Sequence, residues 1–582
     1  MSGTEGAVGG AAERADALER AFGALDDPAN PLGADALLAA DAAGTVLPEA
    51  ERVLDTFGLN AEFVPADVGG RLERMDDLGR LLRPVFRRDA SLGFGHGLNC
   101  FFAAAPVWTA GNPRQRLHAA RLLLTGRRIA VARHEVAHGN DFVRDEFTAR
   151  IVPGGLVVDG SKSAIANASR ATGLVVFART GETARGRSHT VLLLDRDELP
   201  AGRVTHLGRR TTTGMRSTEF GGLAISDCPV PASTVLGEIG DGYELSLRSS
   251  LLIRGLIPSI VLAGADTALR TVARFAVRSR TDGRSSLDVR HVRDVLTGGF
   301  LDLLVIDCLA LVATRALHLL PRQMSAYAAA AAYLAPKLVA ESMDEMSSVL
   351  GEETFAQDGA YGMFQKQRRD LPVTSLGHAG SAGRQVSILP QLPYFARHAW
   401  FADPEPPPSL FRPDEALPPL DLSQLVLLGD GDPLAATLVA CTDLLEAARP
   451  PHGEGGPALH FLVRVLTGEL GDLKKAFENV AEGDRAALAS PRSFGLADRY
   501  TLVLAAAACL GVWRGQRSAP AGGANAFLAA PAWVTAVLYR LVGRLGLPLP
   551  DRPHGQERLV LDEVVARLHN RRSYDLYASR LP

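Results

Sequence analysis

Cysteine is scarce in this chain of 582 residues, and the five cysteines lie far apart, at Cys100, Cys228, Cys308, Cys441 and Cys509. A disulfide scaffold needs densely spaced, paired cysteines, and a zinc site needs closely spaced Cys or His ligands. An odd number of isolated cysteines in mostly apolar surroundings argues against both. We therefore expect buried free thiols in a reducing compartment, which predicts a cytoplasmic protein.

Charge of one sign is nowhere concentrated. The formal net charge is −3 at pH 7, and the chain has no continuous basic run of the kind that binds nucleic acid or an anionic membrane surface. Residues 1–6 lack the basic flank and apolar core of a secretory signal. The most apolar runs, Ala326–Ala335 and Thr501–Trp513, are shorter than the roughly 20 residues that cross a bilayer. The sequence thus predicts a soluble protein with no nucleic-acid or membrane partner.

Apolar residues at helical spacing fill most of the chain. They make up 47% of the sequence against 22% charged residues, an ordinary balance for a globular protein, and the length allows three or four domains. Bulky apolar residues on several faces of residues 301–320 indicate a helix buried from more than one side. The periodicity predicts helices over residues 47–57, 73–87, 97–110, 113–125, 242–278, 286–320, 325–349, 433–448, 457–480, 494–514, 524–545 and 556–577.

A β-rich stretch interrupts the helices between residues 129 and 243. It holds short runs of apolar and β-branched residues divided by Gly, Asp and Pro, a pattern typical of a small sheet or barrel. The runs predict strands at residues 147–151, 156–158, 173–178 and 190–194. Further along, the run Asp403-Pro-Glu-Pro-Pro-Pro-Ser409 predicts a stiff linker.

Six short motifs occur in order between about residues 50 and 400. Together they resemble the acyl-CoA dehydrogenase and acyl-CoA oxidase superfamily, for example its Thr-Glu-Pro-x-Ala-Gly-Ser-Asp strand-to-loop motif and its GL…VP…GG loop. The arrangement of helices, a small β domain and more helices is also that of the family. The motifs that carry the resemblance are Leu59–Gly70, Asp89–Gln115, His134–Asp141, Asp159–Ala168, Val230–Gly242 and Arg254–Gly283.

The resemblance implies a mostly α, α+β fold. We expect an N-terminal helical domain, a central small β-barrel-like domain, a C-terminal four-helix bundle and an additional helical domain beyond a Pro-rich linker. It also implies a homodimer or homotetramer. The expected boundaries are 1–128, 129–243, 244–402, 403–420 for the linker and 421–582 for the additional domain.

The family's reaction removes an α proton from an acyl thioester while a hydride leaves the β carbon for FAD, so it needs a carboxylate base. The family places its Glu in one of two positions. In the turn after Arg369-Asp370 this chain has His378, and before Arg254 it has Ile253. Neither position holds a carboxylate. The resemblance suggests His378 as the replacement acid or base, Arg254 as an anchor for the pantetheine or diphosphate end of the substrate, and Gly377 as a further substrate contact.

The flavin contacts that the family uses are replaced as well. His134 stands for the Thr of Thr-Glu-Pro, while Ala164 and Ala166 stand for the Trp and Thr of Trp-Ile-Thr. In the motif that reaches the FAD diphosphate, the family's Arg aligns with Ser279, and Arg280 beside it offers a substitute. The resemblance also assigns Gly139 and Asn140 to the cofactor edge, and Asn140 to the substrate as well.

Each of these residues also has a purely structural interpretation. His378 could lie in a Gly-rich loop without a catalytic role, and His134 could be a hydrogen-bonded structural histidine. Glu135 is expected to order its loop. His138 and His134 are not on one helix face and have no third ligand, so no metal site is expected. The basic run Lys366–Arg369 reads as a solvated face or an interface.

Three hypotheses follow. The first is an FAD-dependent dehydrogenase or oxidase of an acyl thioester carried by CoA or an acyl carrier protein. The second is a flavin-free enzyme that uses His378 and His134 for isomerisation, elimination or cyclisation of an acyl or polyketide-like substrate. The third is a non-catalytic partner subunit.

Overall fold

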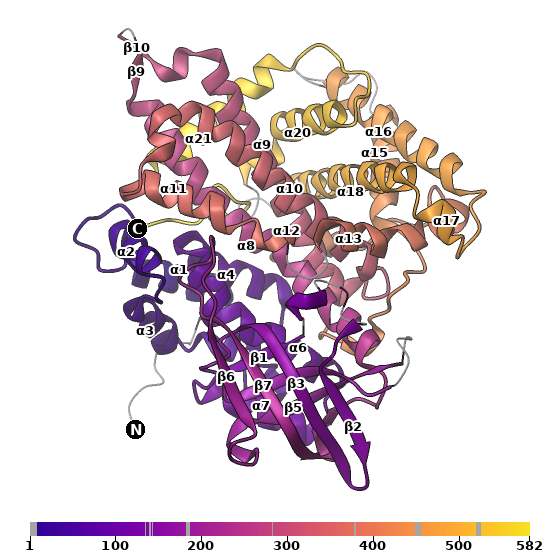
Figure 1. The fold of residues 1–582 in the computed structure, drawn as a ribbon. Helices are drawn as coiled ribbons and strands as arrows, with labels where there is room; N and C mark the ends of the chain where they lie inside the picture. Colours follow the sequence, from indigo (N-terminus) through magenta and orange to yellow (C-terminus); the bar gives the residue numbers. More distant parts are fainter. Residues whose placement is uncertain are drawn as a thin grey trace. The chain divides into compact units, whose positions relative to one another are not determined.

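The computed structural model describes residues 9–133, 135–138, 141, 144–181, 187–281, 283–376, 380–447, 456–518 and 525–582 (Figure 1). The chain divides into two compact units. The first comprises Met1–Ile253 with Gly377–Gly380, and the second comprises Arg254–Leu376 with Ser381–Pro582. The finer domain boundaries expected from the sequence stay predictions.

Helices form the first part of the first unit. The predicted helices at 47–57, 73–87, 97–110 and 113–125 are confirmed to within two residues, and the third of them follows a π-helical segment, η3 (Gly93–Leu98). Helix α2 was not predicted, because its Ala-rich sequence lacks an apolar stripe. The helices are α1 (Ala11–Phe22), α2 (Ala34–Ala43), α3 (Pro48–Phe57), α4 (Met75–Arg88), α5 (Ala90–Leu92), α6 (Asn99–Ala110) and α7 (Pro113–Leu124).

A mixed sheet of eight strands completes the first unit. Its order is β6-β7-β3-β2-β4-β5-β8, and β1 pairs in parallel with β4. The β3–β7, β2–β3 and β4–β5 pairs are antiparallel. Leu174, Val176, Leu192 and Leu194 belong to its buried core. The strands are β1 (Ile129–Ala132), β2 (Thr148–Val152), β3 (Gly155–Ala166), β4 (Gly173–Arg179), β5 (His189–Asp195), β6 (Val204–Arg209), β7 (Phe220–Pro231) and β8 (Val235–Leu236).

The four predicted strands are confirmed, although β3 continues to Ala166, well past the predicted end at residue 158. Strands β6 and β7 were not predicted. Strand β7 contains Gly221-Gly222, Asp227 and Pro229, residues that usually mark turns, and cross-strand pairing overrides that local preference.

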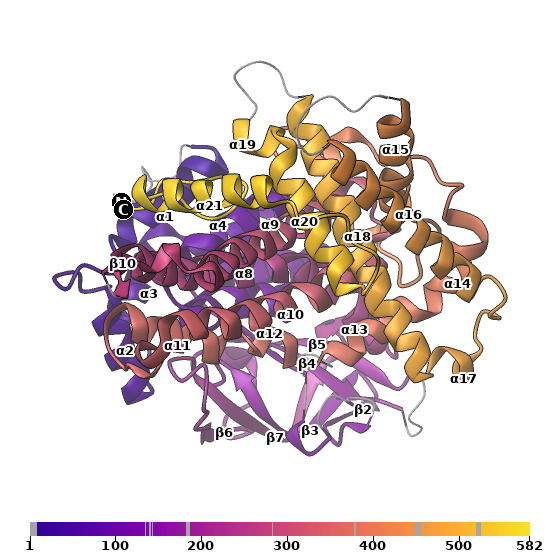
Figure 2. The ribbon, with the colours of Figure 1, turned by 90° about the horizontal axis from the view of Figure 1, so that it is seen from above.

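Long helices build the second unit, and helix α8 (Gly242–Arg278) crosses the division between the units. In Figures 1 and 2, α18, α20 and α21 lie alongside α9. Besides short turns, the helices are α9 (Arg290–Leu319), α10 (Met324–Leu350), α11 (Gly359–Asp370), α12 (Val373–Leu376), α13 (Gly380–Ile388), α15 (Pro433–Ala447), α16 (Gly456–Phe477), α18 (Pro491–Arg517), α19 (Ala526–Ala529), α20 (Pro531–Arg544) and α21 (His554–His569).

The helix predicted over residues 556–577 is wrong at its C-terminal end, because α21 stops at His569. The following loop returns to buried carboxylates of the long helices. The N–H of Tyr574 donates to Asp266 of α8 at 3.2 Å, and the N–H of Leu576 donates to Asp307 of α9 at 2.6 Å. These bonds give the backbone of the loop partners that a continued helix would have supplied.

Among the described residues, α8, α9 and α18 are long and apolar enough to span a membrane by length and composition. The expectation that the apolar segments are too short for this is therefore wrong. The most apolar windows of these helices are 94%, 100% and 78% buried within the protein. The prediction of a helix buried from several sides is confirmed for α9, and this burial accounts for its composition.

The Pro-rich segment after Asp403 is held against α9 by side chains of that helix. Arg315, which is fully buried, donates to the carbonyl oxygens of Ser409 at 2.6 Å and Glu415 at 2.8 Å. Within the same segment, Phe411 packs so closely on Gly511 of α18 that a Cβ there would lie 2.3 Å from its ring. The five cysteines are all buried and free, as expected.

Candidate functional site

Glu135 orders the strand-to-loop segment that follows β1. Its carboxylate accepts the backbone N–H groups of Glu146 at 2.9 Å and Phe147 at 2.8 Å. Burial by itself would raise the pKa of Glu135, but these two donors and the charge of Lys162 outweigh it, so the pKa lies below its usual value. Glu135 thus has the structural role expected from the sequence.

Lys162 of β3 is buried against two carboxylates. Its Nζ forms an ion pair with Asp145, lies 3.4 Å from Glu135 and donates to the carbonyl oxygen of Arg133 at 3.0 Å. Burial raises the pKa of Asp145 to about 6, although Lys162 opposes the shift. These contacts tie the described part of the segment after β1 to strand β3.

Strand β3 carries two of the predicted cofactor positions. Ala164 is exposed and Ala166 is half-buried. Within the described residues of β3 and β7, the strand pairing passes from Lys162 to Ile165 with a register shift that skips Ser163 and Ala164. Bulges of this kind occur frequently beside active sites because they release backbone groups from the ladder.

The bulge determines which groups of Ala164 and Ala166 are available to FAD. A methyl side chain donates no hydrogen bond, so Ala164 and Ala166 cannot replace the side-chain contacts that the family makes. Their backbone groups can still donate and accept. Asn167 next to them is fixed in a left-handed conformation (φ 61°), and its amide donates to the carbonyl oxygen of Gly95. At Ala164 and Ala166 the strand can therefore offer a flavin its backbone groups but no side-chain donor.

Arg254 lies on α8, where its guanidinium donates to the Ser387 hydroxyl of α13 at 3.1 Å. Arg384, on the same helix α13, is buried and donates to the carbonyl oxygens of Thr374 at 2.6 Å and Ser375 at 3.2 Å. Burial, and then the charge of Arg254, lower the pKa of Arg384 to about 10. Among the described residues, no carboxylate forms an ion pair with Arg384. The sequence motifs point to Arg254 but give no signal for Arg384, and the role of Arg254 stays a prediction.

Of the remaining predicted site residues, Arg280 is within the described part of the chain. Arg280 is exposed in a two-stranded hairpin of β9 (Arg280–Thr281) and β10 (Arg284–Ser285). Half-buried His138 lies 3.3 Å from Glu146. His134, Gly139, Asn140, Gly377 and His378 lie outside the described residues.

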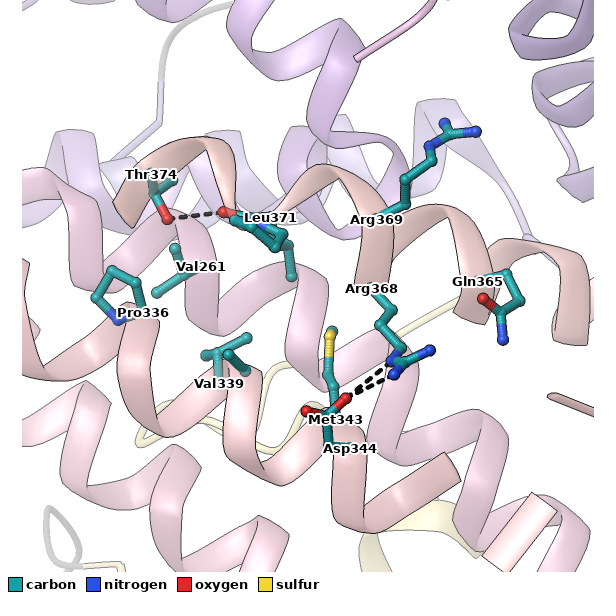
Figure 3. Close-up of a pocket in the computed structure, with 12 residues that line it drawn as sticks. Val261, Pro336, Val339, Met343, Asp344, Gln365, Arg368, Arg369, Leu371 and Thr374 are labelled. Carbon is teal, nitrogen blue, oxygen red and sulfur yellow. Dashed lines mark hydrogen bonds and ion pairs between the residues drawn. The ribbon is translucent and has the colours of Figure 1, made fainter. Parts of the chain in front are cut away.

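A cavity of about 410 Å³ opens between helices of the second unit (Figure 3). Apolar side chains of α8, α10 and the α11–α12 region line one end, among them Val261, Val339 and Leu371, and Arg368 lies at the other. No sequence motif indicates this cavity, because its walls come from three separate segments, at residue 261, residues 336–344 and residues 365–374.

The basic run Lys366–Arg369 at this cavity is not the solvated face that the sequence suggested. Lys366 is buried and binds Asp370 at 2.8 Å, whereas Arg368 is partly exposed. Helical geometry places these neighbouring cations on different sides of α11, so a basic run read along the sequence does not define one surface.

The known proteins most informative about this chain are acyl-CoA dehydrogenases. The chain is 27% identical over 220 residues to the human mitochondrial short-chain specific acyl-CoA dehydrogenase, a match that covers 38% of this chain and 53% of that enzyme. Its fold matches an acyl-CoA dehydrogenase complexed with FAD from Bacillus anthracis, with a TM-score of 0.72 at 14% identity, over 97% of this chain and 96% of that chain. These matches confirm the resemblance to the acyl-CoA dehydrogenase superfamily, of which this chain is a divergent relative.

The chain also resembles a protein whose name states a different activity. It is 30% identical over 236 residues to the amino sugar nitrososynthase RubN8 of Streptomyces rubradiris, covering 37% of this chain and 52% of RubN8. The sequence matches span about half the length of the curated relatives. No protein-family model matches the sequence. The Bacillus anthracis structure, in contrast, extends over the C-terminal region beyond the usual dehydrogenase fold.

Proposed function

We propose that this chain is an acyl-CoA dehydrogenase-like flavoenzyme that dehydrogenates or oxidises an acyl thioester carried by CoA or by an acyl carrier protein. The observation that carries the proposal is that Glu135, Asp145 and Lys162 tie the segment after β1 to β3, the strand with two of the positions assigned to the flavin. The sequence similarity to acyl-CoA dehydrogenases supports the proposal as well. We also propose a homodimer or homotetramer in the cytoplasm.

The backbone of Ala164–Ala166 would hold the flavin edge, with His134, Gly139 and Asn140 beside it and Arg280 toward the diphosphate. FAD supplies a hydride acceptor for the β carbon of the substrate when it is bound. Because both alanines lack side-chain donors, we expect this chain to bind FAD less tightly than a relative with a Thr at the position of Ala166.

The chain's own residues must move the α proton. With Ile253 and His378 at the two positions where the family has its Glu, His378 is the residue we assign as base. A neutral imidazole accepts a proton near pH 7, the range in which histidine titrates. Gly377 beside it completes the proposed substrate contacts.

Arg254 would bind the anionic part of the carrier, and Arg384 would strengthen the local positive potential. A buried guanidinium without an ion-paired carboxylate is costly, and an anion bound nearby offsets part of that cost. The charge of the CoA or phosphopantetheine phosphates matches this requirement.

The proposal is tested by mixing the FAD-loaded protein with a series of acyl-CoA thioesters without oxygen and recording the flavin absorbance. Bleaching by one of them is expected, and His378→Ala should abolish bleaching while FAD stays bound. Bleaching that His378→Ala leaves unchanged would show that another group takes the proton. Failure of every acyl-CoA and acyl-carrier thioester would contradict the proposed substrate class.

A replacement at Arg254 is expected to weaken substrate binding more than turnover. Arg254→Gln should raise KM for the acyl thioester about tenfold or more, because a hydrogen bond to a charged group is worth about 1.5–3 kcal/mol. Arg254→Lys keeps the charge and should restore part of the affinity. Steady-state kinetics measure both, and a KM unchanged in Arg254→Gln would remove Arg254 from the binding site.

A second function is favoured by the alanines at positions 164 and 166. If they exclude the flavin, the space left at the family's flavin position serves a flavin-independent enzyme, in which His378 and His134 isomerise, eliminate or cyclise an acyl or polyketide-like substrate. RubN8, named for an amino sugar rather than an acyl-CoA, is a relative whose substrate is of another kind. Conversion of substrate by protein free of FAD distinguishes this function from the first.

A further inference from the structure

The cavity between α8, α10 and α11 has two chemically different ends (Figure 3). Val261, Pro336, Val339 and Leu371 make one end apolar, and the pair Asp344–Arg368 forms the other. From Pro336 to Asp344 the wall follows α10 for about 12 Å, at 1.5 Å per residue. All of these residues belong to the second unit, so the cavity is formed within one compact part of the chain.

The volume of about 410 Å³ lies within the range of small-molecule sites, roughly 300–1,000 Å³. Such sites combine a mostly apolar lining with a few polar groups that orient the ligand. The apolar end therefore suits a hydrocarbon tail, and the opposite end decides which head group can bind.

The ion pair at that end is weak and geometrically incomplete. Arg368 donates through Nε at 3.0 Å and Nη2 at 2.7 Å to the same oxygen of Asp344, Oδ1. Strong arginine–carboxylate pairs are bidentate, with each N–H meeting a separate oxygen. The two side chains are 41% and 67% exposed, and an exposed pair of this kind contributes little to stability. Asp344 can therefore be replaced at Arg368 at little cost.

We propose that this cavity binds an amphipathic carboxylate, such as a free fatty acid of medium length. Its carboxylate displaces Asp344 and pairs with both donors of Arg368, and its tail packs against Val261, Val339 and Leu371. Asp344 holds Arg368 in position while the site is empty.

The test is calorimetric titration of the full-length protein with octanoate, with octanol as the neutral probe. Saturable binding of octanoate at a single site is expected, and weaker binding of octanol. The two partners of the ion pair then give opposite results. Asp344→Asn removes the competing carboxylate and should tighten octanoate binding up to about fivefold. Arg368→Gln should weaken it about tenfold or more.

Val339→Trp provides an independent test, since it fills the apolar end while leaving Arg368 in place, and it should abolish binding. The control is the pair Arg116–Asp67 of the first unit, also exposed and also held through two contacts, at 2.8 and 3.1 Å. Arg116→Gln and Asp67→Asn should leave octanoate binding unchanged, and thermal melts should show all variants folded.

Weaker octanoate binding in both Asp344→Asn and Arg368→Gln would overturn the proposal. It would show that the ion pair maintains the shape of the cavity and does not compete with the ligand. The absence of saturable octanoate binding to the wild-type protein would overturn it too, as would equal affinity for octanol.

Discussion

Replacing Asp302 by Ala is expected to lower the free energy of unfolding by about 3–5 kcal/mol, the usual cost of breaking a buried ion pair on one side. Asp302 is buried on α9. It accepts from Arg540 at 2.7 Å, from Arg544 at 3.2 Å and from the Ser342 hydroxyl at 2.8 Å. Its loss leaves two arginines of α20 without this carboxylate. Denaturant unfolding monitored by circular dichroism measures the change.

The contribution of Asp302 to the free energy of unfolding should decrease as the pH falls. Burial would raise the pKa of Asp302, but Arg540 and Arg544 outweigh it and hold the pKa below its usual value. The stabilisation is therefore present above the unfolded-state pKa of about 4 and is lost as pH falls through the lower folded-state pKa. The difference between wild type and Asp302→Asn should shrink on acidification.

Asp294, also on α9 but 40% exposed in its pair with Arg552, is the matched control. Its replacement by Ala should cost no more than about 1 kcal/mol. Equal losses at Asp302 and Asp294 would contradict the view that the ion pairs of Asp302 lock α20 onto α9.

A second large loss, at least about 3 kcal/mol, is expected for Asp432→Ala, since each buried donor left unpaired costs about 1–3 kcal/mol. Asp432 is fully buried just before α15. Its two oxygens accept from the Tyr327 hydroxyl at 3.1 Å, the Trp400 indole at 2.9 Å and the Tyr500 hydroxyl at 2.8 Å. Equilibrium unfolding measures the loss, and near-wild-type stability of the variant would contradict this role.

The pH dependence of Asp432 should be opposite to that of Asp302. Burial raises the pKa of Asp432 even though its hydrogen-bond donors oppose the shift. The folded state therefore holds the proton more tightly than the unfolded state, and stability contributed by this group falls as pH rises from about 4 through the folded pKa. Asp432→Asn lacks this titration, so its deficit relative to wild type should shrink as pH rises. A deficit that grows with pH would show that the carboxylate is stabilised in its charged form.

Local periodicity was enough to predict much of the fold. Helix α8 was predicted at its observed bounds because its apolar residues recur at helical spacing over Gly242–Arg278. Strand β7 was missed because its own sequence favours turns, and its pairing with the distant strand β3 overrides that local preference. The end of α21 was missed because the loop that follows it binds Asp266 and Asp307. These two buried carboxylates lie far from the loop in the sequence.

In the candidate site, too, some residues are indicated by local sequence and others depend on tertiary packing. Motif order singled out Arg254, Ala164 and Ala166, and their roles, like those of His134 and His378, stay predictions. Arg384 and the pair Asp344–Arg368 follow no motif, because their positions depend on how helices pack. Buried charge and cavities are properties of tertiary contacts, which periodicity along one segment does not encode.

The most direct test of the central claim is a visible absorption spectrum of the purified full-length protein, before and after incubation with FAD and removal of the excess. We expect the spectrum of a bound flavin at near-stoichiometric occupancy. The backbone of β3 would hold this flavin in place of the family's side chains. A colourless protein that takes up no FAD would contradict a flavoenzyme, and leave acid–base chemistry at His378 as the function to pursue.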